Sequence, residues 1–367
     1  MRMEKVVVGM SGGVDSSVAA WLLKQKGFDV IGVTMQIWQS EEQAVMEDNG
    51  GCCGLSAVDD ARRAAQAIGI PHYVMNFRDE FREKVIDYFN DSYQHGRTPN
   101  PCIACNRYIK WGALLHRSLQ IGADKIATGH YAKVRALESG RYALHTSVTA
   151  AKDQTYALFE LTQDQLAHTL MPIGSYTKDE VRRIAEEAGL PVAHKPDSQE
   201  ICFIPDHDYA KYIKETTGMK DIPGNFVDTA GHVVGRHKGI IHYTVGQRKG
   251  LGVSFGHPVY VVAIHPDTNE VVLGRGDEVY SRVVYAHHLN FMGLANFPGG
   301  LRVIAKIRYS HAGAPASVRM LDADTLECTF DDPVRAVTPG QALVLYSPEE
   351  DSGKTVPGIV YGGGIIM

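Results

Sequence analysis

The first 130 residues alternate between short apolar runs and segments with helical periodicity. Four apolar runs predict buried strands, over residues 4–9, 29–34, 72–76 and 125–128. Apolar side chains three and four positions apart predict helices, over residues 14–26, 58–68, 81–93 and 110–121. This alternation predicts an open α/β domain with a parallel sheet, whose ligands bind at the carboxyl ends of the strands.

The pattern changes after about residue 210. Helical periodicity fades, and short β-prone runs separated by turn residues follow, over residues 259–264, 270–273, 302–309, 316–320, 326–330 and 342–346. These runs predict a small β-rich domain followed by a β-barrel. We therefore expect three domains, over residues 1–209, 210–281 and 282–367.

The composition is that of an ordinary globular chain. Of 367 residues, 44% are hydrophobic and 22% are charged, which excludes disorder, collagen and coiled coil as descriptions of the whole chain. No apolar run approaches the roughly 18 residues that span a bilayer, and the apolar stretch at the N-terminus is too short for a secretory signal. We expect a cytoplasmic protein with no membrane partner, or an organellar one if a transit peptide is missing.

The net charge of −5 is unevenly distributed along the chain. No Asp or Glu lies between Asp228 and Asp267, or between Glu278 and Asp322. These two stretches contain the basic residues Arg236, Lys238, Arg248, Lys249, Arg282, Arg302, Lys306, Arg308 and Arg319. They favour a side of the protein that faces a polyanion, although solvated faces produced by chance are an equal alternative.

A glycine- and serine-rich loop follows the first predicted strand and opens the first predicted helix. Its candidate anion-binding residues are Gly9, Met10, Ser11, Gly12, Gly13, Val14, Asp15 and Ser16. Glycines let the backbone approach an anion, and the amide groups at the start of the helix point toward it. The loop lacks the Gly-Lys-Ser/Thr ending of a Walker motif. It resembles the loop of the N-type ATP pyrophosphatases, which bind the β- and γ-phosphates of ATP there and release pyrophosphate.

Six cysteines are too few for a disulfide scaffold, so in a reducing compartment they are free, metal-binding or catalytic. Cys102 and Cys105 form a C-x-x-C motif before a predicted helix, whose N-terminus favours a thiolate. The motif fits zinc, a redox pair or a cluster, but the second pair that a closed zinc site needs is missing. The other cysteines are Cys202 in a short apolar run, the vicinal pair Cys52 and Cys53, and Cys328, which we expect to be a small buried hydrophobe in its predicted strand.

Eight segments, in order, resemble the tRNA-specific 2-thiouridylase family over almost the whole chain. Besides the loop they are residues 34–36, 98–101 with 105–106, 128–131, 152–156, 197–203, 243–250 and 306–309. The resemblance implies ATP-dependent thiolation of uridine 34, the wobble base, in tRNAs for Lys, Glu and Gln. ATP with Mg²⁺ would bind at the loop, with Met35 and Gly129 near the nucleotide. The uracil 2-oxygen would be adenylated with loss of pyrophosphate.

The resemblance also assigns the sulfur chemistry and the RNA contacts. The family's persulfide-bearing cysteine corresponds to Cys202, and its nucleophile, which closes a disulfide with that cysteine, corresponds to Cys105. Carbon 2 of a flipped base accepts the sulfur. Residues expected at the target base are Asn100, Pro101 and Cys102. Residues expected to contact the rest of the tRNA are His130, Lys152, Asp153, Gln154, Arg308, Tyr309 and Gln341.

One departure from the family leaves the sulfur route open. Many members carry Asp where this chain has Cys102, so no catalytic carboxylate is transferred to this sequence. Three candidate thiolates, Cys102, Cys105 and Cys202, can instead hold a [4Fe-4S] cluster that receives inorganic sulfide, as in related tRNA thiolases. Sulfur would then arrive either as a persulfide, from a cysteine desulfurase or a sulfur-relay protein, or as sulfide on the cluster.

Two functions from other classes stay open at this point. An ATP-pyrophosphatase ligase that adenylates a small molecule would explain the loop, but not Cys105, Cys202 or the basic β-rich half. A non-enzymatic RNA-binding or cluster-carrying protein would explain the basic half, but it would not need an intact phosphate loop.

Overall fold

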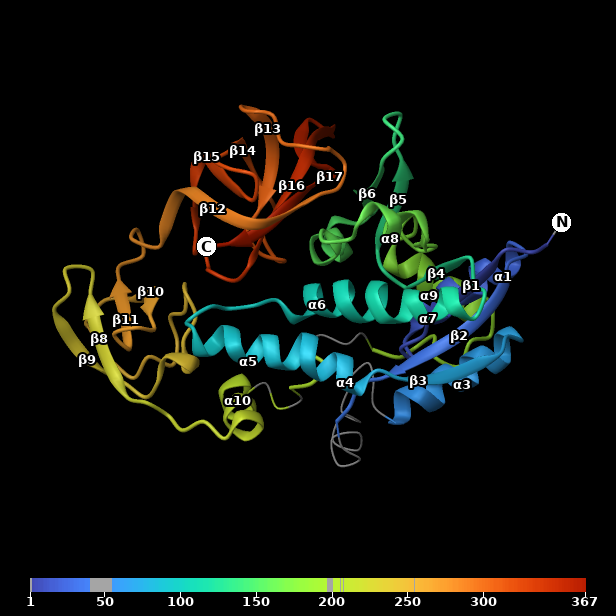
Figure 1. The fold of residues 1–367 in the computed structure, drawn as a ribbon, viewed down its shortest axis with the longest axis horizontal. Coiled ribbons are helices and arrows are strands. Elements are labelled where there is room, and N and C mark those ends of the chain that lie inside the picture. The colour runs from blue at the N-terminus through green and yellow to red at the C-terminus, as the bar shows by residue number, and fades with distance from the viewer. Residues whose placement is uncertain (1, 40–54, 197–200, 205, 207, 254) are drawn as a thin grey trace. The chain divides into compact units, whose positions relative to one another are not determined.

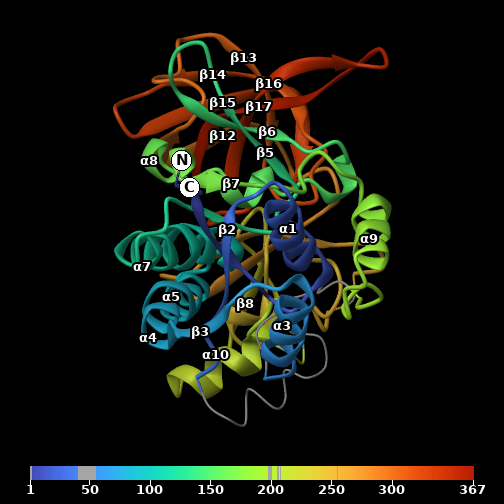
Figure 2. The same cartoon turned by 90° about the vertical axis from the view of Figure 1, so that its right-hand side faces the viewer.

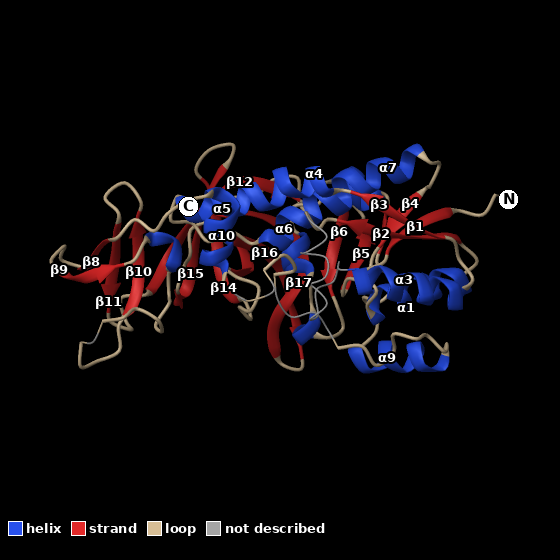
Figure 3. Ribbon diagram, turned by 90° about the horizontal axis from the view of Figure 1, so that it is seen from below, coloured by secondary structure: helices blue, strands red, loops and turns tan. Residues whose placement is uncertain are grey.

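The computed structural model describes residues 2–39, 55–196, 201–204, 206, 208–253 and 255–367. They form two compact units. Unit 1 consists of Met1–Ile86 and Pro101–His207, and unit 2 of Asp87–Asn100 and Asp208–Met367. Unit 1 mixes helices with strands, whereas strands dominate unit 2 (Figure 3). Unit 2 contains both of the β-rich segments predicted after residue 210, so their division at residue 281 stays a prediction.

Unit 1 is built on a five-stranded parallel sheet, which confirms the predicted α/β fold (Figure 1). In spatial order its strands are β3 (His72–Asn76), β2 (Asp29–Gln36), β1 (Lys5–Gly9), β4 (Lys125–Ala127) and β7 (Thr169–Leu170). Val6, Val7 and Val8 of β1 are fully buried, as expected for a central parallel strand covered on both faces. From β1 the chain adds β2 and then β3 on one side of the sheet, and it then returns to the other side of β1 with β4. That switch point is where such sheets bind ligands.

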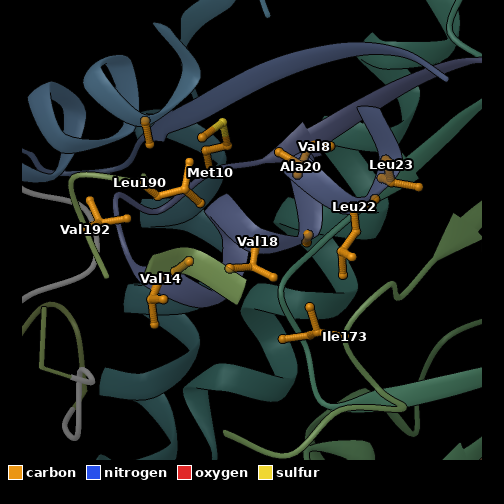
Figure 4. Packing of buried hydrophobic residues seen from close by; sticks show 14 of the residues in the cluster. Val8, Met10, Val14, Val18, Ala20, Leu22, Leu23, Ile173, Leu190 and Val192 are labelled. Carbon is orange, nitrogen blue, oxygen red and sulfur yellow. The ribbon is translucent and has the colours of Figure 1, made fainter. Parts of the chain in front are cut away.

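Three helices of unit 1 pack together: α1 (Val14–Gln25), α3 (Leu55–Ile68) and α9 (Lys178–Glu187) (Figure 2). Val14, Val18 and Leu22 of α1 are four residues apart and therefore form one apolar stripe. Figure 4 shows this stripe in a buried cluster with Ile173 and Leu190. The cluster anchors the start of α1, and hence the loop that precedes it.

Residues 101–120 are helical throughout, so the helix begins at Pro101 and not at the predicted residue 110. The run consists of α6 (Pro101–Ala104), the π-helical segment η3 (Cys105–Leu114) and α7 (Leu115–Gln120). Proline suits the first helical position, where its missing N–H costs no hydrogen bond. The predicted helix over 81–93 is likewise divided, into α4 (Arg78–Phe81), the π-helical η2 (Arg82–Ile86) and α5 (Asp87–Gln94). Unit 1 also contains the hairpin β5 (Ala132–Ala136) and β6 (Tyr142–Thr146), the short 3₁₀ segments η4 (Ala150–Lys152) and η5 (Thr155–Leu158), and α8 (Gln163–Ala167).

Unit 2 begins with helices beside a four-stranded sheet. The sheet order is β10 (Tyr260–His265), β11 (Glu270–Gly274), β8 (Gly224–Asp228) and β9 (Val233–His237). The helical elements are α5, α10 (Tyr209–Thr217) and the 3₁₀ turn η6 (Ile240–His242). Tyr93 of α5 stacks on Tyr209 with ring centroids 4.8 Å apart, and the Asn90 amide donates to the Thr216 hydroxyl at 3.1 Å. These contacts explain why residues 87–100, predicted with the first domain, pack in unit 2.

The rest of unit 2 is a six-stranded closed barrel, which confirms the predicted C-terminal β-barrel. Its strands in order are β12 (Tyr280–Phe291), β15 (Thr325–Arg335), β14 (Ala314–Met320), β13 (Leu301–Lys306), β16 (Ala342–Asp351) and β17 (Lys354–Ile366). Pairing of β12 with β17 closes the barrel. The sequence analysis missed both of these strands. β17 contains Pro357 and the glycines at 362–364, residue types that are depleted in strands, and its closure depends on neighbours far away in the chain.

Candidate functional site

The predicted anion-binding loop runs from the end of β1 into the first turn of α1. Gly12 has a φ of 70°, and a Cβ at this position would lie 2.2 Å from the carbonyl oxygen of Ala57. Only glycine tolerates both conditions. Gly13 is the N-cap of α1 and supplies no capping side chain. The amide donors of the first helical turn are therefore left for an anion.

The other loop residues differ in whether a side chain or only a backbone group is available to a ligand. The backbone N–H of Ser11 donates to the hydroxyl oxygen of Ser16 at 3.2 Å, so this hydroxyl supports the loop itself. Met10 and Val14 are 2% and 3% exposed and belong to the core. Of the predicted nucleotide-binding residues, these two can meet a ligand only through their backbone groups.

Asp15, in the first turn of α1, is held by two residues from outside the loop. The Lys178 ammonium donates to both carboxylate oxygens, at 2.8 and 2.9 Å. The Tyr131 hydroxyl donates to Oδ1 at 2.8 Å. A carboxylate inside an anion-binding loop would repel a phosphate, and the lysine compensates that charge.

Lys178 is a site residue that the sequence analysis missed. It is the first residue of α9, directly after the N-cap Thr177, which forms a capping box with Glu180. The helix dipole disfavours a cation at a helix N-terminus, so a lysine right after a capping threonine is the one local signal for a special role. Its partner Asp15 lies 163 positions away in the sequence, beyond the reach of any local pattern.

The end of β4 closes on the same loop. A Cβ on Gly129 would lie 2.5 Å from the Ser16 nitrogen and 2.6 Å from the Asp15 carbonyl carbon, so only glycine allows this approach. On β2, beside Met35, the Thr34 hydroxyl donates to the Met10 carbonyl at 2.8 Å. The structure thus gathers the predicted loop, Met35 and Gly129 at the carboxyl ends of β1, β2 and β4.

The three cysteines of interest all belong to unit 1. Cys102 is exposed in the first turn of α6, whereas Cys105, the first residue of η3, and Cys202 are half-buried. The ring of Phe203, next to Cys202, packs edge-on against Phe81 of α4 at 5.7 Å. Since α4 also packs against η3, the segments of Cys105 and Cys202 share one neighbouring helix.

The described residues show no preformed metal centre. Among them, no three His, Cys, Asp or Glu side chains lie close enough together to hold a metal ion. Cys102, Cys105 and Cys202 therefore do not fit a [4Fe-4S] cluster as they stand in this structure. Cys328 is buried in the barrel, and burial raises the pKa of its thiol to about 12, so it is the small buried hydrophobe that was predicted. Cys52 and Cys53 lie outside the described residues.

His130, a predicted RNA contact, is buried beside the helix that contains Cys105. Its Nδ1 lies 2.7 Å from the Thr128 hydroxyl, and its Nε2 lies 3.4 Å from the Lys110 ammonium. The same ammonium donates to the Asn106 side chain at 2.8 Å. Burial first, and then the charge of Lys110, hold the pKa of His130 well below its usual value. A neutral imidazole that accepts from Lys110 results, so a direct contact with RNA would require this side chain to move.

The predicted RNA-binding residues 152–154 form a turn attached to Tyr131. The Asp153 carboxylate accepts hydrogen bonds from the Ser147 N–H at 2.7 Å and from both the N–H and the hydroxyl of Thr155. Asp153 is 8% exposed and therefore shapes the turn. Gln154 pairs with the Tyr131 backbone in both directions: its side-chain oxygen accepts from the Tyr131 N–H at 2.9 Å, and its own N–H donates to the Tyr131 carbonyl at 3.0 Å.

In unit 2, ion pairs modify the predicted basic side. Arg302 is bound by both oxygens of Asp331, at 2.8 and 2.5 Å, and Arg319 pairs with Glu327 at 2.8 Å. These acids follow the acid-free stretch in sequence but lie beside it in the barrel. Arg308 instead donates to a backbone carbonyl, that of Arg335, at 2.8 Å and forms no ion pair with an acid among the described residues, while the neighbouring Tyr309 is 45% exposed.

Gln341 lies beside the segment that leads to Asn100. Its side-chain amide donates to the carbonyl of Thr98 at 2.9 Å, and the Thr98 N–H donates to the Pro339 carbonyl at 2.8 Å. Gln341 therefore positions residues 97–100 within unit 2. Pro101 and Cys102, the other residues predicted at the target base, belong to unit 1.

Comparison with known proteins places this architecture in a defined class. Three family models match in succession: the tRNA methyl transferase HUP domain over residues 4–206, the tRNA methyl transferase PRC-barrel domain over 210–275 and the aminomethyltransferase beta-barrel domain over 281–366. The class is thus a HUP-domain protein with two C-terminal β-rich domains.

Full-length relatives identify the family within that class. The chain is 62% identical over 365 residues to the tRNA-specific 2-thiouridylase MnmA of Lachnoclostridium phytofermentans, covering 100% of both chains. It is 55% identical to the protein of the same name from Clostridioides difficile, over 99% of this chain and 98% of that one. The chain belongs to the tRNA-specific 2-thiouridylase family, whose members are tRNA sulfurtransferases.

The likeness to a solved U34-tRNA thiolase, NcsA from Methanococcus maripaludis with its [4Fe-4S] cluster, is slight. It has 19% identity and a TM-score of 0.33, over 58% of this chain and 66% of that one, and it supports no argument about the cysteines here. Among the described residues, no helix combines the length and the apolar character needed to cross a membrane.

Proposed function

We propose that this protein uses ATP to replace the 2-oxygen of the wobble uridine of tRNA by sulfur, with a cysteine persulfide as the sulfur carrier. One observation supports this most directly. The unit that holds an anion-binding loop at the switch point of its sheet also holds two half-buried thiols, on segments that share the helix α4. Activation by ATP and sulfur transfer are thereby available within one compact unit.

In the proposed reaction, the loop first binds the phosphates of ATP. Backbone amides of residues 12–16 and the α1 dipole stabilise the negative charge that develops on pyrophosphate as it leaves. The uracil 2-oxygen attacks the α-phosphorus, and the base becomes adenylated at that oxygen. Adenylation turns the 2-oxygen into part of a good leaving group, because AMP departs readily whereas hydroxide does not.

Sulfur transfer then takes two steps. The terminal sulfur of a persulfide on Cys202 attacks carbon 2, and AMP leaves with the electron pair of the carbon–oxygen bond. The Cys105 thiolate next attacks the inner sulfur of Cys202, so that the sulfur–sulfur bond breaks toward the base. The products are 2-thiouridine and a Cys105–Cys202 disulfide, which an external thiol must reduce before a persulfide donor reloads Cys202.

The test uses the full chain purified without oxygen, with unmodified tRNA, ATP and a persulfide donor. Cys105→Ala and Cys202→Ala should each abolish 2-thiouridine formation, measured by mass spectrometry of nucleosides, while tRNA-dependent pyrophosphate release continues. Cys328→Ala is the matched control, because its thiol is buried in the barrel, and it should keep full activity. Pyrophosphate release that is independent of tRNA would favour the small-molecule ligase instead.

Iron and labile sulfide measured on the same preparation decide between the two sulfur routes. The persulfide route predicts no iron and an active Cys102→Ala variant. About four iron and four sulfide per chain, lost together with activity in Cys102→Ala, would overturn that route in favour of sulfide delivery on a cluster.

A further inference from the structure

Tyr131 contacts two parts of unit 1. One is the anion-binding loop, for which ATP is the proposed ligand, and the other is the turn of residues 152–154, for which tRNA is the predicted ligand. Its ring is 2% exposed and belongs to the main core cluster. Its hydroxyl reaches the phosphate loop, where it donates to Asp15 at 2.8 Å. Its backbone reaches the turn of residues 152–154, where it exchanges two hydrogen bonds with Gln154. One buried residue therefore joins the two parts, through its backbone on one side and its hydroxyl on the other.

On the loop side, the bond from Tyr131 acts on the charge of Asp15. The carboxylate is shared between the Tyr131 hydroxyl and the Lys178 ammonium, which also lies 6.0 Å from the centre of the Tyr131 ring. The direction in which this carboxylate points sets the electrostatic potential at the start of α1, where a phosphate would bind. A shift of the Tyr131 hydroxyl reorients the Asp15 carboxylate and so changes the potential at the start of α1.

On the other side, the turn of residues 152–154 is hydrogen-bonded to Tyr131 in a way that passes a displacement of the turn to this residue. Gln154 contacts Tyr131 through both its side chain and its backbone, and the adjacent Asp153 fixes the turn to Ser147 and Thr155. Two opposed hydrogen bonds resist sliding and rotation of one segment against the other. Movement of the turn as a ligand binds is thereby passed to the Tyr131 backbone.

We propose that Tyr131 is a positioning residue that couples RNA binding at residues 152–154 to the phosphate loop through Asp15. This inference rests on the proposed function, because it takes tRNA and ATP as the two ligands. RNA on the turn fixes the position of the Tyr131 backbone, and the Tyr131 hydroxyl then holds Asp15 in the orientation that suits bound phosphates. ATP is then used efficiently only when tRNA is present. By thermodynamic linkage, ATP must tighten tRNA binding by the same factor.

The test measures the affinity for a non-hydrolysable ATP analogue by calorimetry, with and without tRNA. In the wild type, tRNA should raise this affinity by about five- to tenfold, a typical coupling between two sites. In Tyr131→Phe the ring stays in the core but the bond to Asp15 is lost, and the ratio should fall to less than about twofold. The ratio is formed within each variant, so any change in the affinity without tRNA is measured separately and does not enter the comparison. Tyr176→Phe, which alters a tyrosine packed on the same core cluster, should keep the full ratio.

A Tyr131→Phe variant that folds, binds both ligands and keeps the wild-type ratio would overturn the coupling. So would a wild type that binds both ligands without any coupling. Failure of the proposed function looks different: the wild type would then release no pyrophosphate with tRNA. Hydrogen exchange on the unmodified chain gives a second measurement that needs no variant. The ATP analogue alone should slow exchange of the Tyr131 and Gln154 amides, and unchanged exchange would contradict the proposal.

Discussion

Individual residues of the candidate site have partners that their motifs do not indicate. Asp15 belongs to an anion-binding loop, yet a lysine and a tyrosine from distant segments neutralise and orient it. His130, predicted to contact tRNA, is a neutral, buried acceptor beside Lys110 in this structure, and its contact with RNA stays a prediction. The partners of both residues, and the lowered pKa of His130, follow from packing, which a linear pattern does not contain.

Lys178 provides a prediction at this scale. Lys178→Met should lower the free energy of unfolding by about 1–2 kcal/mol, less than for a fully buried pair because Asp15 is partly exposed. It should also weaken ATP binding, since the uncompensated carboxylate repels phosphate. Chemical denaturation and calorimetry measure the two effects.

Two further variants show whether the ion pair causes these losses. Adding Asp15→Asn to Lys178→Met removes the unpaired charge and should restore most of the lost stability. Arg183→Met, on the exposed side of the same helix, should change neither quantity. Equal losses in the Arg183 and Lys178 variants would show that α9 is merely sensitive to substitution.

Among the elements, the start of the helical run 101–120 and the charge pattern of the barrel differ most from what the sequence predicted. The run starts earlier than predicted and contains ten π-helical residues from Cys105 onward. This conformation is rare in proteins, and where it occurs it is often at a functional site. In the barrel, Asp331 and Glu327 on β15 neutralise Arg302 and Arg319. Charge counted along the chain therefore overstated the basic surface, and it left Arg308 as the more promising contact for a phosphate.

Arg308 and Arg302 make a matched pair for testing the barrel, because replacing either one changes the net charge equally. Arg308→Ala should weaken tRNA binding severalfold and reduce the slope of log affinity against log salt by about one. Arg302→Ala should change affinity by no more than about twofold, because Asp331 already compensates its charge. Filter binding over a range of salt concentrations measures both. Equal effects would mean that only net charge matters and that Arg308 has no direct contact.

At the scale of the whole molecule, the prediction concerns how the stability of the two units depends on pH. Each unit contains a histidine whose pKa is lowered: the buried His130 in unit 1 and the half-buried His311 in unit 2. Burial first, and then the charges of Arg308 and Lys306, lower the pKa of His311 to about 4. The unfolded chain, with an ordinary histidine pKa near 6.5, binds more protons than the folded chain between pH 6.5 and 4. Stability should therefore fall as the pH drops through this window.

His311→Leu tests that expectation on the intact protein. In the wild type, the melting temperature of unit 2 should fall between pH 7 and pH 4.5, and the variant should recover about 2–4 °C of that fall, the effect of about 1 kcal/mol after allowance for partial solvent access. Calorimetric scans at each pH measure this, with the exposed His265→Leu as the control. If both variants have the wild-type slope, other groups govern the acid response.

The sequence by itself determined the parallel sheet, the phosphate loop, the barrel and the family, because each rests on local periodicity or on motifs of adjacent residues. Gly12 could be read as essential from the loop alone, and Cys328 as buried from its strand. Only the tertiary structure paired Lys178 with Asp15, joined Tyr131 to Gln154, moved residues 87–100 into unit 2 and matched Arg302 with Asp331. Those outcomes depend on which distant segments share a core or a barrel wall. Long-range packing decides that, and with it the charge and protonation of the site.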